Sequence, residues 1–239
     1  MRPMRVKLLA ATTPLALAAA LMLPTAAHAD ATAECNANAG PDGTPGNVDD
    51  PSATLECGEN AIASGSGSTA TGVDSIASGL FSTATGWSST ATGTGSTATG
   101  MDSEAIGGYS TAVGASAYAV SNSTAIGNGS EARGEASTVT GKSGFASGTN
   151  STAVGFTASA GGTFLGGFTN AGTTALGANA QAGASPDGQA NATAVGESAL
   201  ANAVGASAFG QGANATGDGA VALGQASVGA EANTVPVGG

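Results

Sequence analysis

The sequence predicts an all-β protein whose short strands stack as the turns of a solenoid. Three observations carry this prediction: a glycine-terminated motif that recurs about every seven residues, a difference in character between alternate copies of the motif, and a composition of 239 residues with 40 glycines but only 4% aromatic residues. A short fixed period is the signature of a repeat architecture, in which each turn packs only against its neighbours.

The recurring motif reads Ser-x-Ala-x-Gly, and its most regular copies are STATG, STAVG and STAIG. Because side chains alternate between the two faces of a strand, the serine, alanine and glycine share one face, and the two intervening residues share the other. Two strands can then close against each other with little room between them. We expect a thin interior of small residues, since the chain lacks the side chains of a conventional core.

Alternate copies differ at the residue before the closing glycine, so the full repeat has about fourteen residues, with two strands and two turns. In one class of strand this residue is first threonine and then mostly aliphatic. In the other class it is mainly polar, as at Ser64, Ser78, Thr92, Arg133 and Ser147. We therefore expect one strand of each turn to face an apolar neighbour and the other strand to face water.

Residues 1–29 are predicted to be a signal peptide. Three basic residues precede an apolar stretch, residues 8–23, and Ala27-His28-Ala29 supplies an A-x-A cleavage site. No later stretch has the length and apolar character of a membrane-spanning helix. We expect an exported chain with no membrane span after cleavage.

Residues 30–60 are predicted to form an irregular lead-in, because acidic residues, prolines and the two cysteines gather there. In an oxidising compartment Cys35 and Cys57 are expected to form a disulfide, closing a loop of about 23 residues and contributing about 3 kcal/mol. The segment is expected to cap the first turn, whose open strand edge would otherwise invite another strand.

Residues 61–239 carry the repeat, which is interrupted twice. The spacing between equivalent glycines rises to 22 residues from Gly155 to Gly177 and to 19 residues from Gly177 to Gly196. The extra residues are expected to form loops, which in solenoids often bind ligands. The first insertion is the more apolar, and it supplies Phe164, Leu165 and Phe168 as candidates for contact with a ligand or a neighbouring protomer.

Charge and composition exclude several classes of function. Beyond the signal, Arg133 and Lys142 stand against sixteen acidic residues, a balance that disfavours nucleic acid and anionic membranes as partners. The single histidine, His28, lies in the signal, which removes Ser-His and Cys-His nucleophilic systems from the mature chain. We expect no enzyme activity, no catalytic or metal-binding residues and no cofactor.

Several motif copies resemble the head repeats of trimeric autotransporter adhesins, the YadA-like family of bacterial surface proteins. These copies are Ser110–Gly114 (STAVG), Ser123–Gly127 (STAIG), Ser151–Gly155 (STAVG) and Ala220–Gly224 (AVALG), and the resemblance covers about residues 61–238. It implies a left-handed parallel β-roll, a homotrimer, and a location at the cell surface (outer membrane) or in the medium. It also implies attachment to host extracellular matrix or to another host or abiotic surface, with the ligand unknown.

The resemblance gives the aliphatic column a role as the contact between protomers. That contact is expected at Val113, Ile126, Val154, Leu176, Val195, Phe209, Leu223 and Val237.

A second interpretation, an ice-binding solenoid, is supported by the first three turns. Thr69, Thr71, Thr83, Thr85, Thr97 and Thr99 form a flat Thr-x-Thr array, with spacings of about 6.6 Å along a strand and about 4.8 Å between turns. The array stops at Val113. The two interpretations differ in oligomeric state, because a trimer buries the array whereas an ice binder exposes it.

Overall fold

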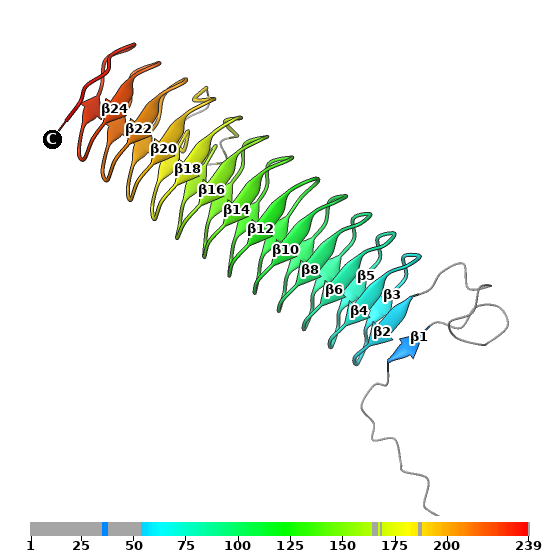
Figure 1. Ribbon diagram of the computed structural model, residues 1–239. Helices are drawn as coiled ribbons and strands as arrows, with labels where there is room; N and C mark the ends of the chain where they lie inside the picture. The colour runs from blue at the N-terminus through cyan, green and yellow to red at the C-terminus, as the bar shows by residue number, and fades with distance from the viewer. Residues whose placement is uncertain (1–34, 38–53, 164–166, 168, 186–187, 239) are drawn as a thin grey trace, which may run out of the picture. The chain divides into compact units, whose positions relative to one another are not determined.

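The computed structural model describes residues 35–37, 54–163, 167, 169–185 and 188–238. Within these ranges the chain contains strands and turns only, so it offers no helix able to cross a membrane. Its strands form two sheets of 13 and 12 strands, and from β2 onward consecutive strands alternate between the sheets to build about twelve stacked turns (Figure 1). The predicted all-β parallel solenoid is confirmed.

The first sheet, sheet A, receives the three-residue strands together with one short strand at its N-terminal edge. It contains β1 (Asn36–Ala37), β2 (Leu55–Cys57), β4 (Thr69–Thr71), β6 (Thr83–Thr85), β8 (Thr97–Thr99), β10 (Thr111–Val113), β12 (Thr124–Ile126), β14 (Thr138–Thr140), β16 (Thr152–Val154), β18 (Thr174–Leu176), β20 (Thr193–Val195), β22 (Ser207–Phe209) and β24 (Val221–Leu223).

The second sheet, sheet B, receives the two-residue strands that lie between them in the chain. It contains β3 (Ile62–Ala63), β5 (Ile76–Ala77), β7 (Thr90–Ala91), β9 (Glu104–Ala105), β11 (Tyr118–Ala119), β13 (Glu131–Ala132), β15 (Phe145–Ala146), β17 (Ser159–Ala160), β19 (Gln181–Ala182), β21 (Leu200–Ala201), β23 (Asn214–Ala215) and β25 (Val228–Gly229).

Equivalent motif positions pair between turns, so the sequence period is the structural period. Thr69 pairs with Thr83 in a parallel ladder, and the same register continues along sheet A. At the first insertion Thr152 pairs with Thr174, and at the second Thr174 pairs with Thr193. The extra residues leave the ladder and return without shifting it, which confirms the predicted period and the two places where it is interrupted.

The interior consists almost entirely of alanine and serine. From β3 onward each strand except β14 directs one small residue inward, and alanines such as Ala84, Ala98 and Ala105 are fully buried. Several buried serine hydroxyls bond to the main chain of the same turn: that of Ser103 donates to the Gly100 carbonyl at 2.9 Å, and that of Ser110 donates to the Gly107 carbonyl at 2.7 Å. Small residues thus fill the thin interior that the motif predicted.

The closing glycines let consecutive turns touch through their backbones. A Cβ atom added at Gly93 would collide with the backbone carbonyl of Gly107 in the next turn. At Gly86 the φ angle is also left-handed, at 132°, which L side chains rarely adopt. Glycine is therefore required at these corners by contact as well as by conformation.

One turn departs from the alanine rule and compensates within itself. Val139 takes the inward position of β14 that alanine holds in the neighbouring strands, and it is fully buried. Gly144 stands where the adjacent turns have Ser130 and Ala158, and a Cβ atom there would lie 2.7 Å from Val139 Cγ1. The missing side chain at Gly144 makes room for the larger one at Val139.

The stack begins inside the segment that the sequence assigned to the lead-in. Leu55–Cys57 pairs in parallel with Thr69–Thr71, although it lacks the motif. Glu56 occupies the inward position, and its Oε1 accepts the Ala63 N–H at 2.7 Å. On the outer edge of β2, β1 pairs antiparallel, with Asn36 opposite Glu56. These contacts cover the first turn where a preceding repeat would otherwise be needed.

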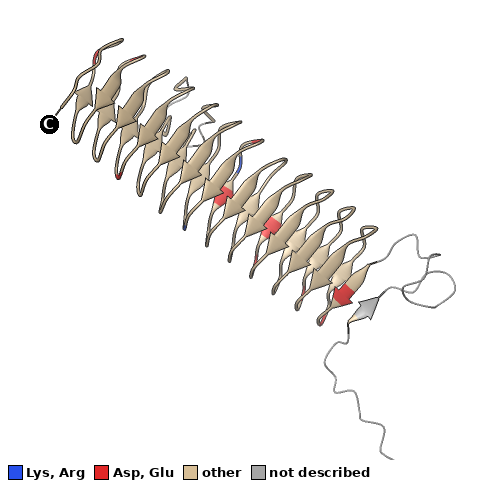
Figure 2. Ribbon diagram, viewed as in Figure 1, with Lys and Arg blue, Asp and Glu red and all other residues tan. Residues whose placement is uncertain are grey.

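Charged side chains are sparse over the described turns (Figure 2). Most lie at the corners between strands, whereas Glu104 in β9 and Glu131 in β13 lie on sheet B itself. Among the described residues, no three His, Cys, Asp or Glu side chains gather closely enough to hold a metal ion. The surface of the described turns is therefore mostly neutral, with a few charged residues at the corners and on sheet B.

Candidate functional site

The outer face of sheet A carries two parallel columns of side chains. One is the threonine column that begins at Thr69, and the other is the aliphatic column of predicted protomer contacts. Members of the aliphatic column pair in register, as Leu176 does with Val195 and Phe209 with Leu223, and Val237 extends it by a bridge to Leu223. The structure therefore brings the predicted residues into one line, which Thr140 of β14 interrupts between Ile126 and Val154.

The aliphatic column is accessible along its length. Ile126, Leu176 and Leu223 are between 42% and 45% exposed, Phe209 is 38% exposed, and Val113, Val154 and Val195 are half-buried. Parallel sheets usually have both faces covered, and contiguous apolar surface on a soluble protein marks an interaction site. This face has the character of a surface that a partner covers.

In the first three turns the apolar side chains shift from the strand to the adjacent corner. Thr71, Thr85 and Thr99 occupy the column there, while the residues two positions later are Val73, Trp87 and Met101, which are 39%, 52% and 50% exposed. The column prediction missed this corner, because it followed only the residue before each closing glycine. The residues two positions after each column residue recur with the same fourteen-residue spacing. Following them along the sequence would have predicted the apolar corner.

The Thr-x-Thr array lies beside that corner in the arrangement that its spacing predicted. Its threonines pair in register from β4 to β8 and lie on the outer face of sheet A. Within the described turns, none of these six hydroxyls is engaged in a side-chain hydrogen bond. At β10 the array ends, because Val113 replaces the second threonine.

The outer face of sheet B is less polar than the sequence predicted. Its column consists of the residues that precede the inward alanines, and it includes Ile62, Ile76, Tyr118, Phe145, Leu200 and Val228 among polar members. The prediction rested on the residues that follow those alanines, such as Ser78 and Thr92. The residue on the other side of the alanine points outward as well, and it is often large and apolar.

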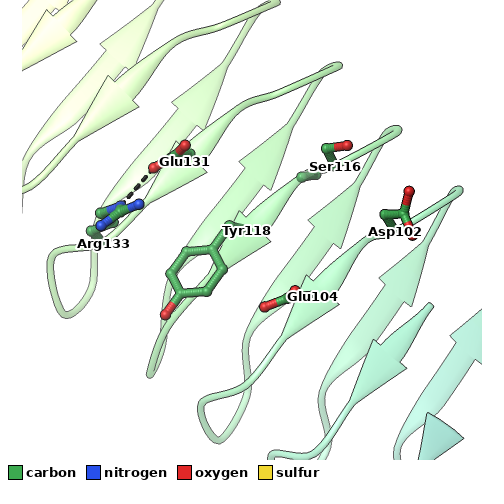
Figure 3. A pocket seen from close by; sticks show the side chains of 7 residues that line it. Asp102, Glu104, Ser116, Tyr118, Glu131 and Arg133 are labelled. Atoms are coloured by element: carbon green, nitrogen blue, oxygen red, sulfur yellow. Dashed lines mark hydrogen bonds and ion pairs between the residues drawn. The ribbon is translucent and has the colours of Figure 1, made fainter. Parts of the chain in front are cut away.

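A hollow of about 270 Å³ opens on sheet B around β9, β11 and β13 (Figure 3). It is lined by Asp102, Glu104, Ser116, Ala117, Tyr118, Glu131 and Arg133. Glu104, Tyr118 and Glu131 are consecutive partners in the ladder, so their side chains form one column on the outer face. The hollow therefore follows from a strict register that brings three distant sequence positions together.

Arg133 is held in place on this face by three neighbours. Its Nε donates to Glu131 Oε2 at 2.6 Å, and its guanidinium carbon lies 5.5 Å from the ring centre of Tyr118 and 5.9 Å from that of Phe145. Such stacking of a guanidinium on aromatic rings is favourable, more so when part of the surface is desolvated. Sequence reasoning recorded Arg133 only as a polar member of its column and missed the cluster.

The two insertions meet at one buried side chain. Asn170 is 4% exposed, and its Nδ2 donates to the carbonyls of Gly183 and Ser185 at 2.9 Å and 3.2 Å. Its Oδ1 accepts the N–H groups of Gly188 and Gln189, both at 2.8 Å. Asn170 thus fastens the second insertion to the first. The predicted contact residues Phe164, Leu165 and Phe168 lie outside the described residues.

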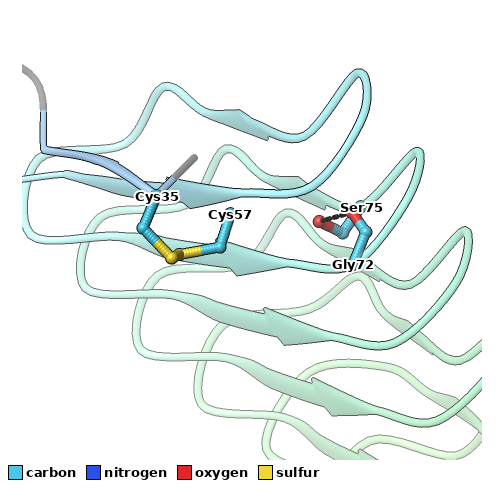
Figure 4. Close-up of a disulfide and its surroundings, with 4 residues drawn as sticks. All are labelled: Cys35, Cys57, Gly72 and Ser75. Atoms are coloured by element: carbon cyan, nitrogen blue, oxygen red, sulfur yellow. Dashed lines mark hydrogen bonds between the residues drawn. A yellow bond between two sulfur atoms is a disulfide. The ribbon is translucent and has the colours of Figure 1, made fainter. Parts of the chain in front are cut away.

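A disulfide joins Cys35 to Cys57, with the two Cα atoms 4.1 Å apart (Figure 4). The bond links the residue before β1 to the last residue of β2, which itself pairs with β4. It therefore ties the short antiparallel strand to the first turn of the stack.

A solved structure of the collagen-binding domain of the Yersinia adhesin YadA is similar to the chain, with 23% sequence identity over 76% of this chain and 73% of that one, and a TM-score of 0.31. No curated protein matches the chain.

The family comparison covers more of the stack. The model of the YadA head domain repeat (2 copies) matches residues 58–82, 77–103, 121–143, 146–164, 189–213 and 201–227, which together make up more than half of the sequence. These matches include β3 to β8, β12 to β14, β16 and β17, and β20 to β24. The chain therefore belongs to the YadA head repeat family of adhesins.

Proposed function

We propose that this chain is the head of a homotrimeric adhesin that attaches to host extracellular matrix or to another host or abiotic surface. Family membership supports an adhesin-type function. The observation that carries the trimer is the exposed column of sheet A from Val113 to Val237, which is aliphatic or aromatic in every turn except at Thr140. In this proposal three chains turn that column toward a common axis and leave sheet B facing outward.

In this proposal the head binds through many repeated weak contacts and catalyses no reaction. An aliphatic side chain that is nearly half exposed gains on the order of 1 kcal/mol when a partner covers it, and the column repeats that gain from turn to turn. Three copies of a shallow site on one rigid body raise the overall avidity without a deep pocket. The exported head acts without catalysis or a cofactor, at the cell surface or in the medium.

The test is a charge placed in the middle of the column. Leu176→Asp combined with Leu223→Asp is expected to convert a trimer to a monomer, because six carboxylates cannot be desolvated at one axis. Sedimentation velocity measures the mass. Retention on plates coated with collagen, coated with fibronectin or left bare is expected to fall at least tenfold on whichever surface holds the unaltered protein.

The matched control is Val204→Asp, which places the same charge at a corner residue that is 47% exposed and lies outside the column. This variant is expected to remain trimeric and to attach normally. The proposal fails if the double variant keeps the mass and attachment of the unaltered protein.

Ice binding is the second candidate, and the in-register threonines of β4, β6 and β8 favour it. Their hydroxyls lie on the outer face in a regular array. This function requires the array to remain exposed, so it predicts a monomer whose solutions show thermal hysteresis. Thr85→Leu would then abolish the hysteresis without changing the mass.

A further inference from the structure

We propose that the hollow on sheet B is a subsite for a positively charged side chain, an arginine or lysine, of the protein to which the head attaches. The proposal rests on the proposed function only in naming that protein as the adhesion target. Glu104 and Tyr118 form the subsite, with Asp102 at its rim (Figure 3).

The contact proposed for the external cation already exists within the chain, one turn beyond the subsite. On the C-terminal side of Tyr118, β13 continues as Glu131-Ala132-Arg133, and the guanidinium of Arg133 bonds to Glu131 while lying over the Tyr118 ring. Carboxylate and ring together hold a cation on this face. The arrangement shows that the geometry of neighbouring turns suits a guanidinium.

The N-terminal side of Tyr118 repeats the acid but lacks the cation. There β9 continues as Glu104-Ala105-Ile106, so an apolar residue takes the place of Arg133. Glu104 is exposed, and within the described residues its side chain takes part in no ion pair or hydrogen bond. Its register partner is Tyr118 itself. One carboxylate and one flank of the ring are therefore available to a cation from outside.

The surroundings suit the whole of a long basic side chain. Ile106 is 41% exposed beside Glu104 and offers apolar surface for a methylene stem. Three carboxylates, those of Asp102, Glu104 and Glu131, line the hollow against the single charge of Arg133. The surplus negative charge attracts a basic group and repels an acidic one, in keeping with the acidic balance of the chain.

The experiment compares three peptides immobilised at equal density on a biosensor surface. The peptides consist of glycine and serine around one central residue, which is arginine, lysine or the neutral isostere citrulline. The exported protein is expected to be retained about tenfold more strongly by arginine than by citrulline, with lysine between them, because an exposed ion pair and a cation–π contact add.

Variants assign the effect to the subsite. Glu104→Gln and Tyr118→Leu each remove one of the two contributions and should each lower retention on arginine toward the citrulline level, whereas Tyr118→Phe, which keeps the ring, should preserve it. Leucine is tolerated in this column, since Leu200 occupies it naturally. The matched control is Glu135→Gln, which removes one exposed charge outside the hollow and should change retention less than twofold.

Equal retention on arginine and citrulline would overturn the subsite, and so would an equal loss in Glu104→Gln and Glu135→Gln, which would assign the effect to the general acidic field. The unaltered protein separates this proposal from the proposed function. If it fails to attach to matrix-coated plates while arginine is still preferred over citrulline, the subsite stands and the adhesion proposal falls.

Discussion

At the residue scale, the closing glycines decide whether turns can stack. Gly93 is buried, and its backbone lies so close to the Gly107 carbonyl that there is no space for a side chain. Gly108, fifteen residues further along the chain, has only the Thr94 carbonyl oxygen near its would-be Cβ, at 3.8 Å. Neither glycine adopts a left-handed φ angle, so the pair isolates contact from conformation.

Gly93→Ala is expected to lower the free energy of unfolding by more than about 2 kcal/mol, because the colliding group is backbone that cannot rotate away. Urea unfolding followed by circular dichroism measures the change. Gly108→Ala is the control, and its effect is expected to stay within about 0.5 kcal/mol. Similar losses in both variants would contradict the contact between turns as the cause.

Residue identity was predictable where the repeat constrains it and unpredictable where it does not. The inward alanines and serines followed directly from alternation along the strands. The corner residues Phe81 and Tyr109 did not, because they are 66% and 72% exposed and have φ angles of 55° and 54°. Bulky residues rarely adopt that conformation, but the turn imposes it, and equivalent corners use Gly95 or Asn122 instead.

At the element scale, each turn must keep its thickness constant for the ladders to continue. The turn that contains β14 and β15 does so with an exchange, a larger Val139 against a smaller Gly144. Val139 and Gly144 look like unrelated departures from the repeat in the sequence, but the smaller residue compensates for the volume of the larger one. Their coupling is measurable because each residue can be returned separately to the common alanine.

Gly144→Ala alone is expected to destabilise the protein by about 1–3 kcal/mol through overpacking against Val139. Val139→Ala alone should cost a similar amount through the cavity it leaves. The double variant restores the usual turn and should be close to the unaltered protein. Unfolding free energies of all four proteins give the coupling energy, and strictly additive losses would disprove the exchange.

The elements of sheet A were more predictable than those of sheet B. In sheet A the repeat specifies both outward residues of most strands, threonine and an aliphatic residue, so the composition of this face could be predicted from the sequence. In sheet B the strands are only two residues long, and the outward residue before the alanine varies from Glu104 to Tyr118 and Phe145. The hollow depends on which of these become neighbours, and that required the register.

At the scale of the whole molecule, the solenoid presents two faces suited to different partners. Sheet A offers a repetitive face of threonine and apolar side chains, as expected for association with further copies of the same chain. Sheet B offers a varied face with a local cluster of charge and aromatic rings, as expected for a distinct ligand. The repeat predicted the first face because uniformity is visible in the sequence, whereas the second face consists of departures from the repeat.

The mass of the protein in solution tests the central claim most directly. Sedimentation equilibrium at micromolar concentration is predicted to give three times the mass of the chain, with a monomer in the Leu176→Asp, Leu223→Asp variant. A monomeric unaltered protein would contradict the account of sheet A as a surface for self-association, and thermal hysteresis in the same sample would assign that face to ice.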